Sequence, residues 1–215
     1  MNNRLTVLQK LNIYRETAIK ILRGFWCRIF FADSKSLLFI GKHVSLHNRR
    51  HIHVGRNVKF EALSEVQGLS THGIVLGNNV TIGYGTQIRP SSYYGVGHIG
   101  FGLEMGDNSS IGPMGFVGCS GSIKIGSNVM IGPNVSMIAE NHNFADSSQS
   151  IKEQGVNQKG IVIEDDVWIG TNVVILDGVR IGKGAIVGAG SLVSRDLSAK
   201  SILIDKRERY IKRRT

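Results

Sequence analysis

The residues best suited to chemistry lie in one short stretch, Glu140-Asn141-His142-Asn143-Phe144. His142 is the central candidate, because an imidazole titrates near neutral pH and can take a proton from a hydroxyl group. The stretch opens a long insertion directly after a regularly patterned segment, so a rigid framework would hold the imidazole at the mouth of a loop. The chain contains seven histidines, and a single histidine is more often structural than catalytic. Position alone leaves both interpretations open.

The framework around His142 is indicated by an aliphatic residue at every sixth position, which runs through Ile163, Ile169, Ile175, Ile181, Val187 and Val193. A helix repeats at about 3.6 residues and a strand at 2, so a sustained period of six requires a short strand plus a corner. Many anchors are followed by Gly and then by Asn or Asp, which tolerate corner backbone conformations. Three sides would close a triangular coil of about eighteen residues, stacked about 4.8 Å from the next. The pattern predicts an all-β solenoid and disfavours a β-sandwich, whose strands recur every 8–12 residues.

The chain divides into an N-terminal segment (1–36), a β-helix domain (37–199) and a basic C-terminal tail (200–215). The longest break in the repeat, at about 139–160, is predicted to form a loop that projects from the β-helix. Ligands usually bind on the face of a repeat protein that carries its insertions. The tail is equally well explained as a solvated charged terminus.

Residues 4–31 are predicted to form an amphipathic helix, because apolar residues recur at helical spacing and no proline interrupts them. Its polar positions are mostly basic: Arg4, Lys10, Arg15, Lys20, Arg23 and Arg28. The helix is predicted either to cap the open end of the solenoid or to lie on a membrane surface.

The formal net charge of +10 indicates an acidic partner, such as an anionic lipid or a phosphorylated small molecule. Nucleic acid is disfavoured, because aromatic residues make up only 7% of the chain and its positive charge is concentrated at the two ends. Cys27 and Cys119 fit neither a disulfide framework nor a metal site, so both are predicted to be reduced. The N-terminus lacks a signal-peptide pattern and no apolar run is long enough to span a bilayer. We expect a cytoplasmic protein, soluble or peripheral at the inner face of the membrane.

Three segments together resemble the hexapeptide-repeat acyltransferases: residues 125–135 (IGSNVMIGPNV), 141–144 (NHNF) and 160–171 (GIVIEDDVWIGT). The resemblance extends over about residues 76–196 and is closest to the branch of galactoside, maltose and capsule or O-antigen O-acetyltransferases. It implies a left-handed parallel β-helix, assembled as a homotrimer with active sites between subunits. It also implies acetyl-CoA as acyl donor and no metal. His142 would be the general base for direct transfer, with Glu140 and Asn143 orienting the imidazole or the sugar.

The same resemblance assigns coenzyme A to the late coils. The matching residues are Trp168, Gly170, Thr171, Gly188, Ala189, Ser194 and Arg195. The chain departs from the family after Asp196, where Lys206 and Arg207 supply positive charge suited to the 3′-phosphate. The coil at 116–120 lacks the Asn of galactoside-specific relatives, which argues against a simple galactoside as acceptor.

The leading hypothesis is therefore an O-acetyltransferase acting on a sugar of a surface polysaccharide (capsule, O-antigen or exopolysaccharide) or its lipid-linked precursor. An antibiotic O-acetyltransferase of the same fold is the first alternative, since it would share the base and the donor. A zinc carbonic-anhydrase-like protein would need three converging histidines, but only His53 and His72 lie about one coil apart. A non-catalytic or ice-binding β-helix would need a flat face without loops.

Overall fold

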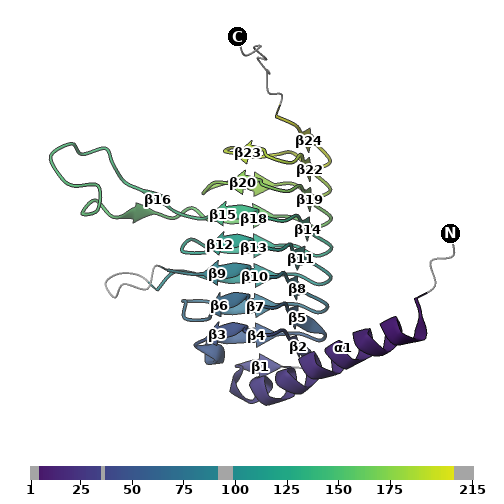
Figure 1. The fold of residues 1–215 in the computed structure, drawn as a ribbon. Helices are drawn as coiled ribbons and strands as arrows, with labels where there is room; N and C mark the ends of the chain where they lie inside the picture. Colours follow the sequence, from purple (N-terminus) through teal and green to yellow (C-terminus); the bar gives the residue numbers. More distant parts are fainter. Residues whose placement is uncertain (1–4, 35–36, 92–98, 206–215) are drawn as a thin grey trace, which may run out of the picture.

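The computed structural model describes residues 5–34, 37–91 and 99–205, and the strands in these ranges form a triangular prism (Figure 1). Its first face is a parallel sheet of β1 (Asp33–Ser34), β4 (Ile52–Val54), β7 (Ile74–Leu76), β10 (Leu103–Met105), β13 (Ile123–Ile125), β18 (Ile161–Ile163) and β21 (Arg180–Ile181). Its second face contains β2 (Leu38–Ile40), β5 (Val58–Phe60), β8 (Thr81–Ile82), β11 (Ser110–Ile111), β14 (Met130–Ile131), β19 (Trp168–Ile169), β22 (Ile186–Val187) and β24 (Ile202–Leu203). Its third face contains β3 (Ser45–His47), β6 (Glu65–Gln67), β9 (Gln87–Arg89), β12 (Phe116–Gly118), β15 (Ser136–Ile138), β20 (Val174–Ile175) and β23 (Leu192–Val193).

The chain passes through the first, second and third faces in turn, so each residue pairs with its counterpart one coil later. The six aliphatic anchors from Ile163 to Val193 all lie buried in the prism. The predicted β-helix is therefore present, and its core is the column of these side chains. Repeating strands also occur at β1 and β24, beyond the predicted limits of 37–199, because Ile202 and Leu203 pair with Ile186 and Val187.

The corners carry the predicted Asn residues in left-handed conformations. Asn79, Asn108 and Asn128 have φ values of 57°, 58° and 59°, which Asn tolerates better than most residues. Their side chains also hydrogen-bond from coil to coil, with Asn79 donating to Asn108 (2.8 Å) and Asn108 donating to Asn128 (3.3 Å). Each Asn thus shapes its own corner and links it to the next.

The N-terminal helix α1 (Val7–Cys27) and the 3₁₀ turn η1 (Arg28–Phe30) occupy most of the predicted helical range of 4–31. Thr6 and Gln9 form a reciprocal capping box at the start of α1. The helix crosses β2 at the N-terminal end of the prism (Figure 1), where Gly24 lies against the carbonyl group of Leu38 and Lys20 pairs with Glu61 at 2.6 Å. The helix therefore covers the free edge of the second face, as predicted for a cap. It is not long and apolar enough to cross a membrane, and the same holds for any helix in the described ranges.

The insertions leave the prism at one corner. The connections from β6 to β7, from β9 to β10 and from β15 to β18 all run from the third face to the first. A second 3₁₀ turn, η2 (Arg49–His51), occupies this corner in the first coil. The connection from β15 to β18 contains the antiparallel strands β16 (Asn141–His142) and β17 (Val156–Asn157), which project from the prism in Figure 1. This corner, called the loop corner below, is where ligands are expected.

Candidate active site

His142 lies in the ribbon formed by β16 and β17, opposite Val156, and its side chain is exposed. Hydrogen bonds connect the ribbon to the loop between β16 and β17. The backbone N–H of Asn143 donates to the carbonyl oxygen of Gly155, and its side-chain amide donates to the carbonyl oxygen of Gln154, both at 3.0 Å. Glu140 is half-buried at the foot of the ribbon. The imidazole of His142 is thus exposed to solvent on a ribbon whose backbone is held by hydrogen bonds.

Hydrogen bonds connect the foot of the ribbon to the coil below it and to the coil above it. Gln158 donates to the hydroxyl of Ser120 (2.5 Å), which belongs to the coil below. The backbone N–H groups of Lys159 and Gly160 donate to the carboxylate of Asp177, from the coil above, at 2.7–3.0 Å. Ala139 donates to the carbonyl oxygen of Gly118 at 3.0 Å. These contacts hold the position of His142 relative to the prism.

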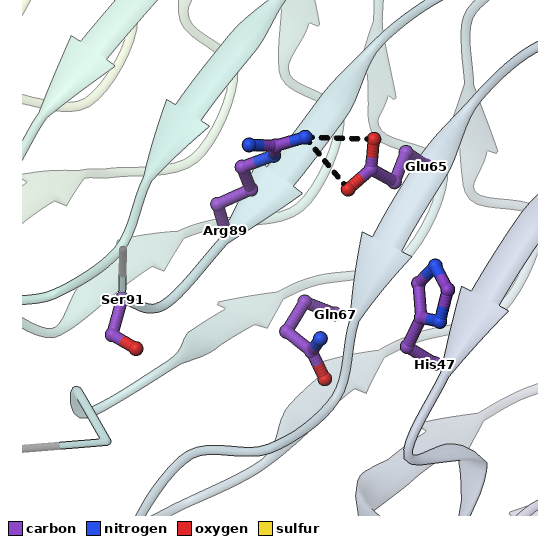
Figure 2. A pocket seen from close by; sticks show the side chains of 5 residues that line it. All are labelled: His47, Glu65, Gln67, Arg89 and Ser91. Atoms are coloured by element: carbon purple, nitrogen blue, oxygen red, sulfur yellow. Dashed lines mark hydrogen bonds and ion pairs between the residues drawn. The ribbon is translucent and has the colours of Figure 1, made fainter. Parts of the chain in front are cut away.

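A pocket of about 330 Å³ opens on the third face and is lined by His47, Glu65, Gln67, Arg89 and Ser91. Figure 2 shows Arg89 and Glu65 joined by an ion pair of 2.9 Å. Gln67 is almost fully buried and is fixed by accepting hydrogen bonds from Asn48 (2.6 Å) and the backbone of Leu69 (3.2 Å). The pocket therefore offers both hydrogen-bond donors and acceptors, as a hydroxyl-rich ligand requires.

The pocket and His142 lie along the same edge of the prism. Arg89 pairs with Gly118, and Gly118 pairs with Ile138, four residues before His142. Two strand spacings therefore separate Arg89 from the strand that leads into the ribbon, about 10 Å. Between them, the ring of Phe116 lies beside Gly118 and is partly exposed. Phe116 therefore lies on the third face between the strand of Arg89 and the strand that leads into the ribbon.

The residues predicted to bind coenzyme A divide between two corners. Trp168 is on the second face and is 52% exposed, because it directly precedes the buried anchor Ile169. Gly170, Thr171, Gly188 and Ala189 follow at the corner between the second and third faces. Ser194 and Arg195 follow β23 at the loop corner, while Lys206 and Arg207 lie outside the described residues.

Within one chain, His142 and the group around Trp168 are thus at different corners, with the third face between them. The outer surfaces of the faces also differ. The first face carries charged pairs, including Glu104 with Lys124 (4.0 Å) and Glu164 with Arg180. Hydrogen bonds from the backbone N–H of Lys183 and from Arg180 hold the pKa of Glu164 below its usual range. On the second and third faces the exposed residues are more apolar: Met130, Trp168, Ile202, Phe116 and Leu192.

Two other candidate chemistries find little support. Burial raises the pKa of Cys119 to about 12, so this thiol stays protonated and cannot serve as a nucleophile near the loop. In the ranges that the structure describes, no group of three or more His, Cys, Asp or Glu side chains is arranged to hold a metal ion. His72 instead packs against the ring of Phe101.

Sequence reasoning did not single out Glu65, Gln67, Arg89 and Phe116. These residues are separated by up to 51 positions between Glu65 and Phe116. Only the pairing of coils brings them onto one surface. The sequence pattern that could have identified them is the alternation along each third-face strand, which predicts that these side chains point outward just before the chain turns at the loop corner.

The fold is a left-handed β-helix built from hexapeptide repeats, which confirms the predicted fold class. Residues 160–195 match the family described as "Bacterial transferase hexapeptide (six repeats)". The chain is 42% identical over 76 residues to a galactoside O-acetyltransferase of Lactococcus lactis, covering 35% of each protein. It is 52% identical over 52 residues to a tetrahydropyridine-dicarboxylate N-acetyltransferase of Staphylococcus aureus, covering 24% of this chain and 22% of the relative. The predicted resemblance to hexapeptide-repeat acyltransferases is thereby confirmed.

Among solved structures, a mutant of AntD, an N-acyltransferase from Bacillus cereus, matches with a TM-score of 0.56 and 21% identity. The match covers 90% of this chain and 89% of AntD, which was crystallised with dTDP-4-amino-4,6-dideoxyglucose and coenzyme A. At this identity the likeness establishes the shared fold. The chain spans only about a third, or less, of the length of the curated relatives named above.

Proposed function

We propose that this protein is an acetyl-CoA-dependent acyltransferase that acetylates a hydroxyl group of a glycan. The observation that carries the proposal is the alignment of His142 with the pocket of Glu65 and Arg89 along the loop corner. An exposed imidazole on the same corner of the prism as a pocket for hydroxyl groups suits general-base activation of an alcohol. The sequence similarity to a galactoside O-acetyltransferase supports the same reaction class.

In the proposed reaction, His142 takes the proton from an acceptor hydroxyl as its oxygen attacks the thioester carbon of acetyl-CoA. A tetrahedral oxyanion forms and collapses, the C–S bond breaks, and the protonated imidazole returns its proton to the departing thiolate. A backbone N–H at a corner would stabilise the oxyanion. No acyl-enzyme is required, in agreement with the protonated, buried state of Cys119.

The proposed acceptor is a sugar of a surface polysaccharide or of its lipid-linked precursor. Arg89 can donate to hydroxyl oxygens and Glu65 can accept from hydroxyl groups, while Phe116 offers an aromatic surface to the apolar side of a sugar ring. Since acetyl-CoA is made inside the cell, the proposed reaction takes place in the cytoplasm.

Mass spectrometry of surface glycans from cells with and without the gene identifies the acceptor. We expect one glycan fragment to lose the mass of an acetyl group when the gene is deleted, and that fragment names the sugar. Unchanged glycans, together with rapid acetylation of chloramphenicol or a streptogramin by the purified protein, would replace the glycan by an antibiotic as acceptor.

We further propose that the active site forms between subunits of a homotrimer. The imidazole and the group around Trp168 belong to different corners of one prism, so a neighbouring chain can bring the two together. Exposed apolar side chains on the second and third faces, such as Met130, Trp168 and Leu192, suit contacts between prisms.

Replacing Trp168 by alanine is expected to weaken acetyl-CoA binding about 5- to 30-fold, the loss of one aromatic contact of roughly 1–2 kcal/mol. The melting temperature should change little, because the side chain is half-exposed. Isothermal titration calorimetry measures the affinity. Tyr84→Ala is the matched control, since Tyr84 is 47% exposed on an earlier coil. Equal affinities for wild type and Trp168→Ala would remove Trp168 from the donor site.

A further inference from the structure

Helix α1 turns its apolar side away from the protein. The helix residues that pack against the β-helix are mostly small or polar. Gly24 is buried, and Thr17, Lys20, Ile21 and Cys27 are half-buried. On the other side lies an outer stripe, which we define as Leu8, Leu11, Ile19, Leu22, Phe25 and Trp26. Each residue of the outer stripe is at least 40% exposed. Helical spacing places Leu8, Leu11, Leu22 and Trp26 opposite Gly24.

The helix cannot bury this stripe by rotating about its axis. A side chain at position 24 would overlap the carbonyl group of Leu38, so only Gly24 allows the close approach to β2. The ion pair of Lys20 with Glu61 fixes the same orientation. Phe31, just after η1, is buried beside Phe60 and anchors the end of the segment. The outward orientation of the stripe is therefore built into the packing.

The stripe also has a defined position in the molecule. Gly41 donates to Phe60 O, so the carbonyl groups of buried second-face residues point toward the preceding coil. Leu38 belongs to the first coil, and its carbonyl group therefore points out of the N-terminal end of the prism, toward Gly24. Because the outer stripe lies opposite Gly24 on the helix, it faces away from this end of the prism.

The charges around the stripe select its partner. Lys10, Arg15, Arg23 and Arg28 lie on the same segment, and Glu16 is the one acidic residue in the sequence from 1 to 31. Arg49 adds a further charge and stacks on Phe30 at 5.3 Å. Two such helices would repel each other, whereas an anionic surface would attract them. By helical spacing Arg15 falls within the outer stripe, where a long arginine side chain can extend to lipid headgroups, and the other basic residues lie elsewhere around the helix. Apolar residues combined with basic ones in this way are typical of helices that lie in the headgroup region of a bilayer.

We propose that α1 docks the protein on an anionic lipid bilayer, with the outer stripe inserted among the acyl chains. Each basic residue near the anionic surface and each inserted apolar side chain adds to the affinity. The helix lies parallel to the surface, since it is not suited to spanning. In the proposed trimer, three helices at the same end would bind together and raise the avidity.

Flotation with lipid vesicles tests this proposal on the full-length protein. We expect binding to phosphatidylcholine vesicles that contain phosphatidylglycerol, at least tenfold weaker binding to pure phosphatidylcholine, and a loss of binding as salt is raised. The variant Leu22→Glu/Trp26→Glu should lose at least tenfold in affinity for the anionic vesicles. Met114→Glu is the matched control, because Met114 is 57% exposed on a β-helix corner, and its binding should be unchanged.

A second measurement reports the insertion itself. In a Trp168→Phe background the emission of Trp26 should shift to the blue on adding anionic vesicles, since position 26 then carries the single tryptophan. The proposal is overturned if the protein does not bind anionic vesicles, or if it binds vesicles with and without phosphatidylglycerol equally well. It is also overturned if Leu22→Glu/Trp26→Glu changes the oligomer size in analytical ultracentrifugation without changing vesicle binding, since the stripe would then be covered by a second copy. Turnover of a water-soluble acceptor by the same variant separates these outcomes from a failure of the proposed reaction.

Discussion

Replacing His142 by alanine is expected to lower the rate of acetyl transfer by about 10²- to 10⁴-fold, the usual contribution of a positioned general base. The affinity for acetyl-CoA should stay nearly unchanged, because the residues around Trp168 that we propose to bind the donor belong to another corner of the chain. Release of the coenzyme thiol measures the rate, and calorimetry measures the affinity. The exposed position of His142 makes misfolding an unlikely cause of any loss.

Two controls sharpen this test. His51→Ala removes another exposed imidazole at the loop corner and should leave the rate unchanged. His142→Gln keeps hydrogen-bonding capacity without basicity near neutral pH, so it should be as slow as the alanine variant. Turnover by His142→Ala equal to that of the wild type would mean that another group takes the proton.

Mixing two inactive variants is expected to restore activity. Ala189 is exposed at the corner between the second and third faces, so Ala189→Trp should block the proposed coenzyme A site without disturbing the core. In a trimer with shared sites, a chain that keeps His142 can be adjacent to a chain that keeps Ala189. Random assembly of His142→Ala with Ala189→Trp would make about a quarter of the sites intact.

The experiment co-expresses the two variants with different affinity tags and purifies assemblies that carry both. Selecting assemblies that carry both tags removes the inactive single-variant trimers and leaves one intact site in every three. We therefore expect turnover of about a third of the wild-type rate, against about 1% or less for His142→Ala alone. Assemblies of mixed composition that stay as slow as the single variants would indicate that each chain carries a complete site. The count of tags by native mass spectrometry controls for failure to mix.

The fold could be predicted because the pattern that determines it repeats within a few neighbouring residues. A six-residue period determines which side chains point inward, and every anchor from Ile163 to Val193 is buried as that period requires. The pocket was not predictable in the same way. The step from Arg89 to its partner Gly118 is 29 residues, while the step from Gly118 to Ile138 is 20, since insertions change the length of each coil. Which residues meet in the pocket on the third face therefore depends on the unequal lengths of successive coils.

The N-terminal helix illustrates a second limit. Its periodicity predicted an apolar stripe but not the direction in which that stripe would face. A buried Gly24 and the pair of Lys20 with Glu61 decide the direction, and both depend on contacts with residues of the first coils. Small and polar side chains at Thr17, Lys20 and Gly24 were the signal in the sequence.

The shared origin of the three insertions has a consequence for how such a protein can diversify. Since the connections after β6, β9 and β15 emerge from a single edge, their lengths and compositions can drift while the stacked coils keep every backbone partner. Changes in these loops can therefore alter which molecules bind at this edge while the stacked coils of the β-helix stay the same.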